Sequence, residues 1–291
     1  MDGVRDLLDR YRVATGKGFR LSRHDPGDTA GLDIRKRDAT ALLAQGVADL
    51  ARLQDMLYAQ DRWSVLVIFQ AMDAAGKDGA IKHVFSGVNP QGCHVVSFKA
   101  PTATELDHDF LWRHVLALPA RGMIGIHNRS WYEEVLVVRV HQDILARQKL
   151  PDAVRSPRVF EERLADIAAH EAYLARQGTL VLKFFLNMSR DEQKKRFMQR
   201  IEDPAKNWKF SERDIAERAR WDDYMAAYEA AIRATATPQA PWFVVPADAK
   251  WFTRLVVAAA IGEALRGLGL AYPEPDAEQR AGLERARAAL A

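Results

Sequence analysis

The chain has little cysteine, little net charge and no long apolar run. Cys93 is the one cysteine in 291 residues, which excludes an internal disulfide and fits a reducing compartment. The 42 basic and 39 acidic residues leave a net charge of +3, so any basic site must be local. The longest apolar run, residues 255–262, is too short to span a bilayer, and the charged N-terminus has no signal-peptide core. These absences predict a cytoplasmic protein without nucleic-acid or membrane partners.

The order of apolar and helical segments predicts an α/β fold. Short apolar runs that are rich in β-branched and aromatic residues alternate with helical patterns, which is typical of βαβ crossovers and a doubly wound sheet. We expect five parallel strands flanked by helices. The predicted strands are residues 64–70, 94–98, 123–127, 180–186 and 242–245.

A phosphate-binding loop is the clearest functional signal. Residues 65–79, VLVIFQAMDAAGKDG, form the pattern of a strand, a small-residue loop and a helix N-terminus, where backbone N–H groups can bind phosphate. Lys77 would reach the terminal phosphates as a point charge. The match to G-x-x-x-x-G-K-[ST] is partial, because Ala71 replaces a glycine and Asp78 replaces the hydroxyl that binds magnesium. Asp73 could supply a carboxylate ligand instead. The alternative is an ordinary helix start that Asp73 caps.

Polar residues also follow the third predicted strand. In open α/β sheets, ligands bind beyond the carboxyl ends of the strands. Asn128 is neutral and would hold magnesium weakly or through water, whereas Arg129 could neutralise a transferring phosphoryl group. Otherwise Arg129 forms a surface ion pair. Glu133 and Glu134 can simply complement a helix dipole. Lys99, after the second strand, either faces the same edge or lies in a mere connection.

Basic residues gather in residues 194–209, KKRFMQRIEDPAKNWK. Arg196 and Arg200 share one face of a helix that Ser189 caps, and Asp203-Pro204 then breaks that helix. A basic helix, a break and a second helix are expected of a lid that closes over phosphates. The alternative is a solvated basic face, which charge runs usually form. The interleaved aromatic residues and the proline favour the lid.

Four blocks across roughly residues 17–270 carry a family resemblance: FQAMDAAGKDGAIKHVFSGVNPQGCHVVSFKAPT, GIHNRSWYEEVLVVRVH, DPAKNWKFSERDIAERARWDDYMAAYEAAI and APWFVVPADAKWF. Together they resemble the polyphosphate kinase 2 family. The resemblance implies a P-loop, thymidylate-kinase-like core with a helical lid. It also implies reversible phosphoryl transfer between inorganic polyphosphate and nucleotides with magnesium, or manganese as an alternative. It matches Asp73 to the metal-organising acid, Lys77 to the phosphate-binding lysine and Arg129 to the arginine after the third strand. The lid positions that it matches are Arg200, Lys206 and Lys209.

The resemblance also suggests which nucleotides react. Asn128 stands where many family members have Asp, and Glu133 where many have Asn. The form NRSxYEEVLVVRVH is similar to the subgroup that phosphorylates both nucleoside mono- and diphosphates. We therefore expect AMP and ADP as acceptors, guanine nucleotides as a second candidate, and a homodimer or homotetramer. The rival interpretations are an ATP-dependent nucleotide kinase and a non-catalytic polyanion-binding protein on the same fold.

These arguments give a complete set of expected site residues. Asp73, Lys77 and Arg129 are the predicted catalytic residues, and Asp73 the predicted metal ligand. The candidate residues for binding nucleotide or polyphosphate are Ala74, Ala75, Gly76, Lys77, Asp78, Gly79, Lys82, Lys99, Asn128, Arg129, Glu133, Arg139, Arg196, Arg200, Lys206 and Lys209. The predicted organisation is an N-terminal helical extension at 1–62, a kinase core at 63–270 with its lid at about 189–215, and a C-terminal tail at 271–291.

Overall fold

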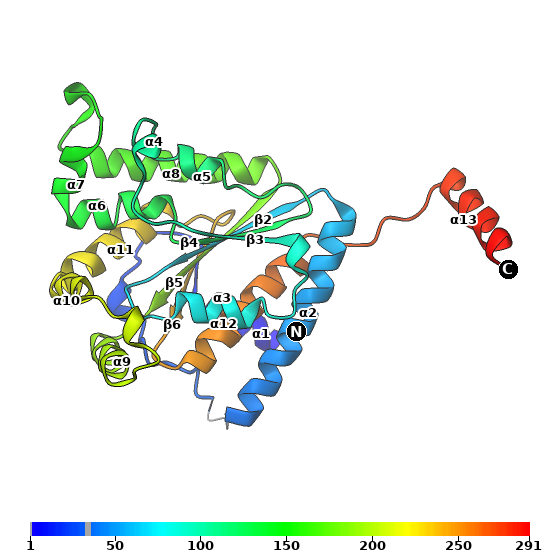
Figure 1. Ribbon diagram of the computed structural model, residues 1–291, viewed down its shortest axis with the longest axis horizontal. Helices are drawn as coiled ribbons and strands as arrows, with labels where there is room; N and C mark the ends of the chain where they lie inside the picture. The colour runs from blue at the N-terminus through cyan, green and yellow to red at the C-terminus, as the bar shows by residue number, and fades with distance from the viewer. Residues whose placement is uncertain (1, 33–35) are drawn as a thin grey trace.

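A six-stranded sheet runs through the molecule in the computed structural model, which describes residues 2–32 and 36–291 (Figure 1). The strand order is β1-β6-β5-β2-β4-β3, and every neighbouring pair is parallel except β1 with β6. The sequence predicted five of these strands and missed β1 (Arg12–Val13), which is two residues long and antiparallel at the sheet edge. The others are β2 (Ser64–Gln70), β3 (Cys93–Ser97), β4 (Ile124–Asn128), β5 (Thr179–Asn187) and β6 (Trp242–Pro246).

Helices cover both faces of the sheet, which is why its central strands are apolar on both sides. Val65, Val67 and Phe69 of β2 face one core cluster, while Leu66 and Ile68 face the other. The first face carries α1 (Asp2–Asp9), α2 (Lys36–Gln60), α3 (Lys77–Val84) and α12 (Lys250–Arg266). The second face carries α8 (Val159–Arg176), α11 (Trp221–Thr235) and the 3-10 turn η3 (Trp131–Glu134).

The predicted lid segment consists of α9 (Arg190–Glu202), the turn η5 (Asn207–Lys209) and α10 (Glu212–Ala219). Ser189 caps α9 as predicted, because its Oγ accepts a hydrogen bond of 3.1 Å from the Glu192 N–H. The remaining short elements are α4 (Ala103–Leu106), α5 (Trp112–Val115), α6 (Val137–Val140), α7 (Gln142–Arg147), η1 (Leu21–Arg23), η2 (Pro90–Gly92) and η4 (Asp152–Val154).

The two ends of the chain differ in how they meet the core. The N-terminal segment adds α1, β1 and α2 to the packed body, and Leu50 and Leu57 of α2 are completely buried. The C-terminal helix α13 (Ala277–Leu290) instead projects away from the body (Figure 1). Across the described ranges, no helix is both long and apolar enough to cross a membrane. The predicted domain boundaries stay a prediction.

Candidate active site

The loop between β2 and α3 has the backbone shape of an anion-binding loop. Ala74 and Gly76 both have positive φ, at 66° and 105°, and they alternate with residues of ordinary φ. Such alternation can turn successive N–H groups toward one point, as in phosphate-binding nests. Gly76 precedes Lys77, the first residue of α3, so the helix dipole adds partial positive charge at the same point. This geometry favours the phosphate-loop interpretation over an Asp73-capped helix.

Lys77 directly follows this loop, and its side chain is poorly solvated. Its Nζ donates a hydrogen bond of 2.8 Å to the Ala71 carbonyl. Burial, followed by the nearby positive charge of Arg129, lowers the pKa of Lys77 to about 8. An anionic phosphate beside Nζ would favour the charged form of this lysine.

Arg129 joins the ends of two strands. Its Nη2 donates to Asp73 Oδ1 and its Nη1 to Glu133 Oε2, each at 2.8 Å. The pKa of Arg129 is raised, chiefly by the negative charge of Glu133. Arg129 also has a positive φ of 66°, and its N–H bonds the Phe69 carbonyl at 3.0 Å. It is therefore a fixed cation between two carboxylates rather than a mobile surface ion pair.

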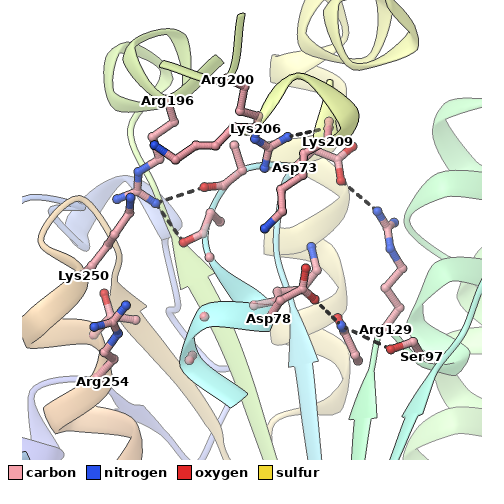
Figure 2. A pocket seen from close by; sticks show the side chains of 18 of the residues that line it. Asp73, Asp78, Ser97, Arg129, Arg196, Arg200, Lys206, Lys209, Lys250 and Arg254 are labelled. Atoms are coloured by element: carbon pink, nitrogen blue, oxygen red, sulfur yellow. Dashed lines mark hydrogen bonds and ion pairs between the residues drawn. The ribbon is translucent and has the colours of Figure 1, made fainter. Parts of the chain in front are cut away.

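A second polar pair sits beside the loop. The Asn128 amide donates to Asp78 Oδ1 at 2.7 Å and to Ser97 Oγ at 3.5 Å. Asp78 and Ser97, the two partners of Asn128, lie below Asp73 in Figure 2. Asn128 thus positions Asp78, the residue that replaces the usual hydroxyl.

These residues line a basic cavity of about 580 Å³ (Figure 2). The carboxylates among its lining residues are Asp73 and Asp78. Its cations come from the loop, from the ends of β3 and β4, from the lid segment and from α12. They are Lys77, Lys99, Arg129, Arg196, Arg200, Lys206, Lys209, Lys250 and Arg254. This excess of positive charge fits a polyanion.

A second cavity of about 400 Å³ meets the first at Asp73, Phe98, Lys99 and Arg129. Its walls differ in chemistry, because they combine apolar and aromatic side chains with carboxylates. The apolar and aromatic walls include Met72, Val137, Val138, Tyr224 and Tyr228, and the carboxylates include Glu133, Asp214 and Glu217.

Most predicted site residues converge on the two cavities, with three exceptions in position or role. Lys82 is exposed on α3 and does not line either cavity. Arg139 also lies outside them, where it pairs with Glu161 at 3.6 Å. Arg196 lines the basic cavity but is 4% exposed and hydrogen bonded to protein groups.

Comparison with known proteins shows which family this chain resembles in sequence and structure. Residues 33–268 match the family model described as polyphosphate kinase 2. An ADP-polyphosphate phosphotransferase of Rhodopseudomonas palustris is 52% identical over 97% of each chain. An AMP/ADP-polyphosphate phosphotransferase of Meiothermus ruber is 45% identical over 92% of this chain and 97% of its own. The crystal structure of polyphosphate kinase 2 from Arthrobacter aurescens TC1 superposes with a TM-score of 0.87 at 44% identity, covering 96% of this chain and 95% of that one.

The chain belongs to the polyphosphate kinase 2 family. The predicted enzyme class, a phosphotransferase of this family, is confirmed. The predicted α/β kinase fold is also confirmed, although its sheet has six strands rather than the five expected. Its activity class is polyphosphate:nucleotide phosphotransfer.

The sequence analysis did not predict two of the cations that line the basic cavity. Lys250 and Arg254 lie on the first turns of α12 and line the basic cavity. The signal was present, because α12 follows β6, and the carboxyl end of β6 reaches the same sheet edge as those of β2 and β4. Treating the fifth predicted strand like the first and third would have found both.

The donor groups at this site fit a magnesium ion that is bound partly by substrate. Asp73 offers a carboxylate whose Oδ1 is bonded to Arg129, which leaves Oδ2 for a ligand. Magnesium in phosphate-transfer sites typically takes one or two carboxylates and completes its shell with water and phosphate oxygens. Accordingly, the described residues contain no cluster of three or more His, Cys, Asp or Glu side chains that could hold a metal alone.

Proposed function

We propose that this member of the polyphosphate kinase 2 family moves the terminal phosphoryl group of inorganic polyphosphate to AMP and to ADP, reversibly, giving ADP and ATP. The observation that carries the proposal is the meeting of the two cavities at Asp73 and Arg129. The basic cavity fits a chain of phosphates. The second cavity has apolar and aromatic walls for a base and ribose, and it brings the acceptor phosphate to the junction.

The proposed chemistry needs positioning and charge neutralisation rather than a strong base. An oxygen of the acceptor's terminal phosphate forms a bond to the terminal phosphorus of polyphosphate. The bridging P–O bond breaks, and its electron pair leaves on the shortened polymer. Because the acceptor oxygen is already anionic, no proton has to be removed. Lys77 would hold the donor phosphates, and Arg129 would face the group in transfer from the junction.

Asp73 would hold magnesium, with manganese as an alternative, and the bound ion would neutralise phosphate charge. The loop residues 74–79 would bind donor phosphates together with the lid cations Arg200, Lys206 and Lys209 and with Lys250 and Arg254. Asp73 would also keep Arg129 oriented through its other oxygen. The Asp73 carboxylate would thus contact both the Arg129 guanidinium and the metal ion that the substrate phosphates also bind.

The choice of AMP as well as ADP is the finer part of the proposal. Of the two relatives above, one is named for ADP and the other for AMP and ADP. In this chain Glu133 lines the second cavity, called the acceptor cavity below, and pairs with Arg129. The Gln70 amide lies 2.8 Å from Glu133 Oε1 and 3.0 Å from Ser130 Oγ, and it fixes the carboxylate when its nitrogen faces Glu133. A fixed carboxylate there could position a water or metal beside the shorter AMP acceptor.

The direct test is product formation by the purified protein with magnesium and long-chain polyphosphate. AMP, ADP and GMP are offered separately, and nucleotides are resolved by chromatography. ATP from both AMP and ADP supports the proposal, whereas ATP from ADP alone limits it to diphosphates. Transfer from ATP but not from polyphosphate would favour an ordinary nucleotide kinase. No turnover with either donor would favour a polyanion-binding protein.

Three further expectations stay predictions. GMP in the same assay tests guanine nucleotides. Light scattering of the purified protein tests the homodimer or homotetramer, and fractionation of the source cells tests the cytoplasmic location.

A further inference from the structure

Side chains of helix α9 donate hydrogen bonds to backbone carbonyl groups of the phosphate loop between β2 and α3. The Gln193 amide donates a hydrogen bond of 3.0 Å to the Asp73 carbonyl. Arg196 Nη1 donates to the Ala74 and Ala75 carbonyls at 3.0 and 2.9 Å. Three consecutive carbonyls of the loop therefore accept from one helix, as Figure 2 shows for the two that bond Arg196.

The same guanidinium also ties the loop to α12. Arg196 Nη2 donates to the Ala247 and Asp248 carbonyls at 2.6 and 3.0 Å. These carbonyls lie just before α12, whose Lys250 and Arg254 line the basic cavity. One side chain thus connects the phosphate loop, the lid helix and the helix that carries two of the cations.

Arg196 has no hydrogen left for a phosphate. A guanidinium carries five N–H donors. The structure gives them five partners, four carbonyls and Glu192 Oε1, the last at 2.8 Å from Nε. Arg196 is 4% exposed, and Gln193 is 1% exposed and does not line the basic cavity. The sequence interpretation of Arg196 as a polyphosphate ligand is therefore not the role that its contacts favour.

The loop conformation explains why such a clamp is needed. Ala74 has a φ of 66°, a backbone conformation that is strained for a residue with a Cβ. Strained backbone persists only where its surroundings over-determine it. The carbonyls of residues 73–75 are bonded to α9, and the Ala75 N–H bonds the Met72 carbonyl at 3.3 Å, so protein contacts fix both sides of this turn of the loop.

We propose that Arg196 and Gln193 are positioning residues that hold the phosphate loop in its anion-binding shape and in register with α12. The inference rests on the polyphosphate:nucleotide phosphotransferase activity. It also assigns most of α9 to the fixed body, so that any lid movement begins after Glu202, where the helix ends.

The test measures kcat and the polyphosphate KM at saturating ADP for Arg196→Lys and Gln193→Met. Lysine keeps the charge but cannot make five bonds, and methionine keeps the shape but cannot donate. Lys195→Gln is the matched control, because Lys195 lies on the same helix, is 67% exposed and pairs with Glu192 at 3.6 Å. Each variant is also made with Ala74→Gly, since glycine adopts positive φ without the Cβ penalty.

We expect Arg196→Lys to lower kcat about 10- to 100-fold, the scale of a small misplacement of reacting groups. Gln193→Met should lower it about 3- to 10-fold, because it removes the bond to the Asp73 carbonyl and the bond of 3.0 Å that Gln193 Oε1 accepts from Arg218. The polyphosphate KM should change by less than about threefold, because neither residue touches phosphate. Ala74→Gly should restore part of the lost kcat in both variants, by about fivefold in Arg196→Lys and by about twofold in Gln193→Met, because it removes the backbone strain that the lost bonds no longer offset.

A rise in KM of about tenfold or more with kcat unchanged in Arg196→Lys would make Arg196 a phosphate ligand and overturn the proposal. So would losses that Ala74→Gly leaves unaltered. If Arg196→Lys does not fold, the Gln193→Met pair decides alone. Wild-type turnover with polyphosphate is measured first, so failure of the proposed activity is seen separately from failure of the clamp.

Discussion

The guanidinium of Arg129 donates a hydrogen bond of 2.8 Å to the Asp73 carboxylate at the point where the two cavities meet. The two residues follow different strands, β2 and β4, whose parallel pairing brings their carboxyl ends together. The bond gives the cation one fixed direction before any substrate arrives. Charge stabilisation of this kind costs little reorganisation during the reaction, which is why fixed donors contribute strongly to catalysis.

Replacing Arg129 by lysine should therefore be severe although the charge is kept. Lysine is a point charge and cannot bridge Asp73 and Glu133 in one plane as Arg129 does. We expect kcat to fall about 100- to 1,000-fold with a smaller change in KM. Steady-state kinetics with polyphosphate and ADP checks this. Arg287→Lys on the projecting α13 is the control, and equal kinetics of the two variants would remove Arg129 from the catalytic group.

The pKa of Lys77, lowered to about 8, predicts a pH dependence with a definite sign. Below pH 8 the side chain is charged and can bind phosphate. As the pH rises through 8 it loses its proton, so kcat/KM for polyphosphate should fall, approaching about tenfold per pH unit well above the pKa. Lys77→Arg, which stays charged, should be less active but flat over the same range. A wild-type profile that stays level to pH 9.5 would contradict the prediction.

Glu133 should matter more for AMP than for ADP. Glu133→Asn removes the carboxylate that faces the acceptor cavity and releases one bond of Arg129. We expect about a tenfold loss of kcat/KM with AMP, the cost of one charge-assisted contact, and a smaller loss with ADP. Parallel assays with the two nucleotides provide the measurement, with Glu161→Gln, outside both cavities, as control. Equal losses with AMP and ADP would mean that Glu133 acts only through Arg129.

Two buried histidines should make the protein sensitive to acid. His114 is completely buried and neither ring nitrogen has a partner in the described structure. Burial lowers the pKa of His114 to about 2 and that of His127 to about 4. Below pH 6.5 the unfolded chain takes up protons that the folded chain does not. The stability is therefore complete above pH 6.5 and falls as the pH decreases toward 4.

Each histidine should cost about 1.4 kcal/mol of unfolding free energy at pH 5.5 relative to pH 7.5. His114→Phe removes one of these losses and also removes the unpaired nitrogens. It should therefore be more stable than wild type, and by a larger margin at pH 5.5. Urea unfolding at the two pH values provides the comparison. A margin that does not depend on pH would show that His114 is not a source of acid sensitivity.

The sequence predicted the parts of this enzyme that depend on short segments. Strands β2 and β5 were predictable because strands buried on both faces are continuous apolar runs. The placement of Asp73, Lys77 and Arg129 at one edge of the sheet was predictable because each follows the end of a strand, whereas their catalytic roles stay a prediction. β1 was not, since two residues at a sheet edge carry almost no pattern.

The role of Arg196 could not be read from the sequence for a different reason. A cluster of basic residues has the same composition whether its members bind phosphate or protein carbonyls. The bonds that distinguish the two cases join Arg196 to residues 122 and 51 positions away along the chain. Such contacts depend on tertiary packing, which local patterns do not encode.

The pairing of β1 with β6 has a consequence for folding during translation. Arg12 and Val13 are translated early, but their partners Trp242 and Phe243 are translated more than two hundred residues later. The phosphate loop likewise waits for Arg196 and then for Ala247. Contacts of such long sequence separation form slowly and late. Until residues near 250 have emerged from the ribosome, a nascent chain therefore lacks the β1–β6 pairing and the bonds that Arg196 makes to the phosphate loop and to Ala247. We expect the kinase to gain its activity only after most of the chain has been made.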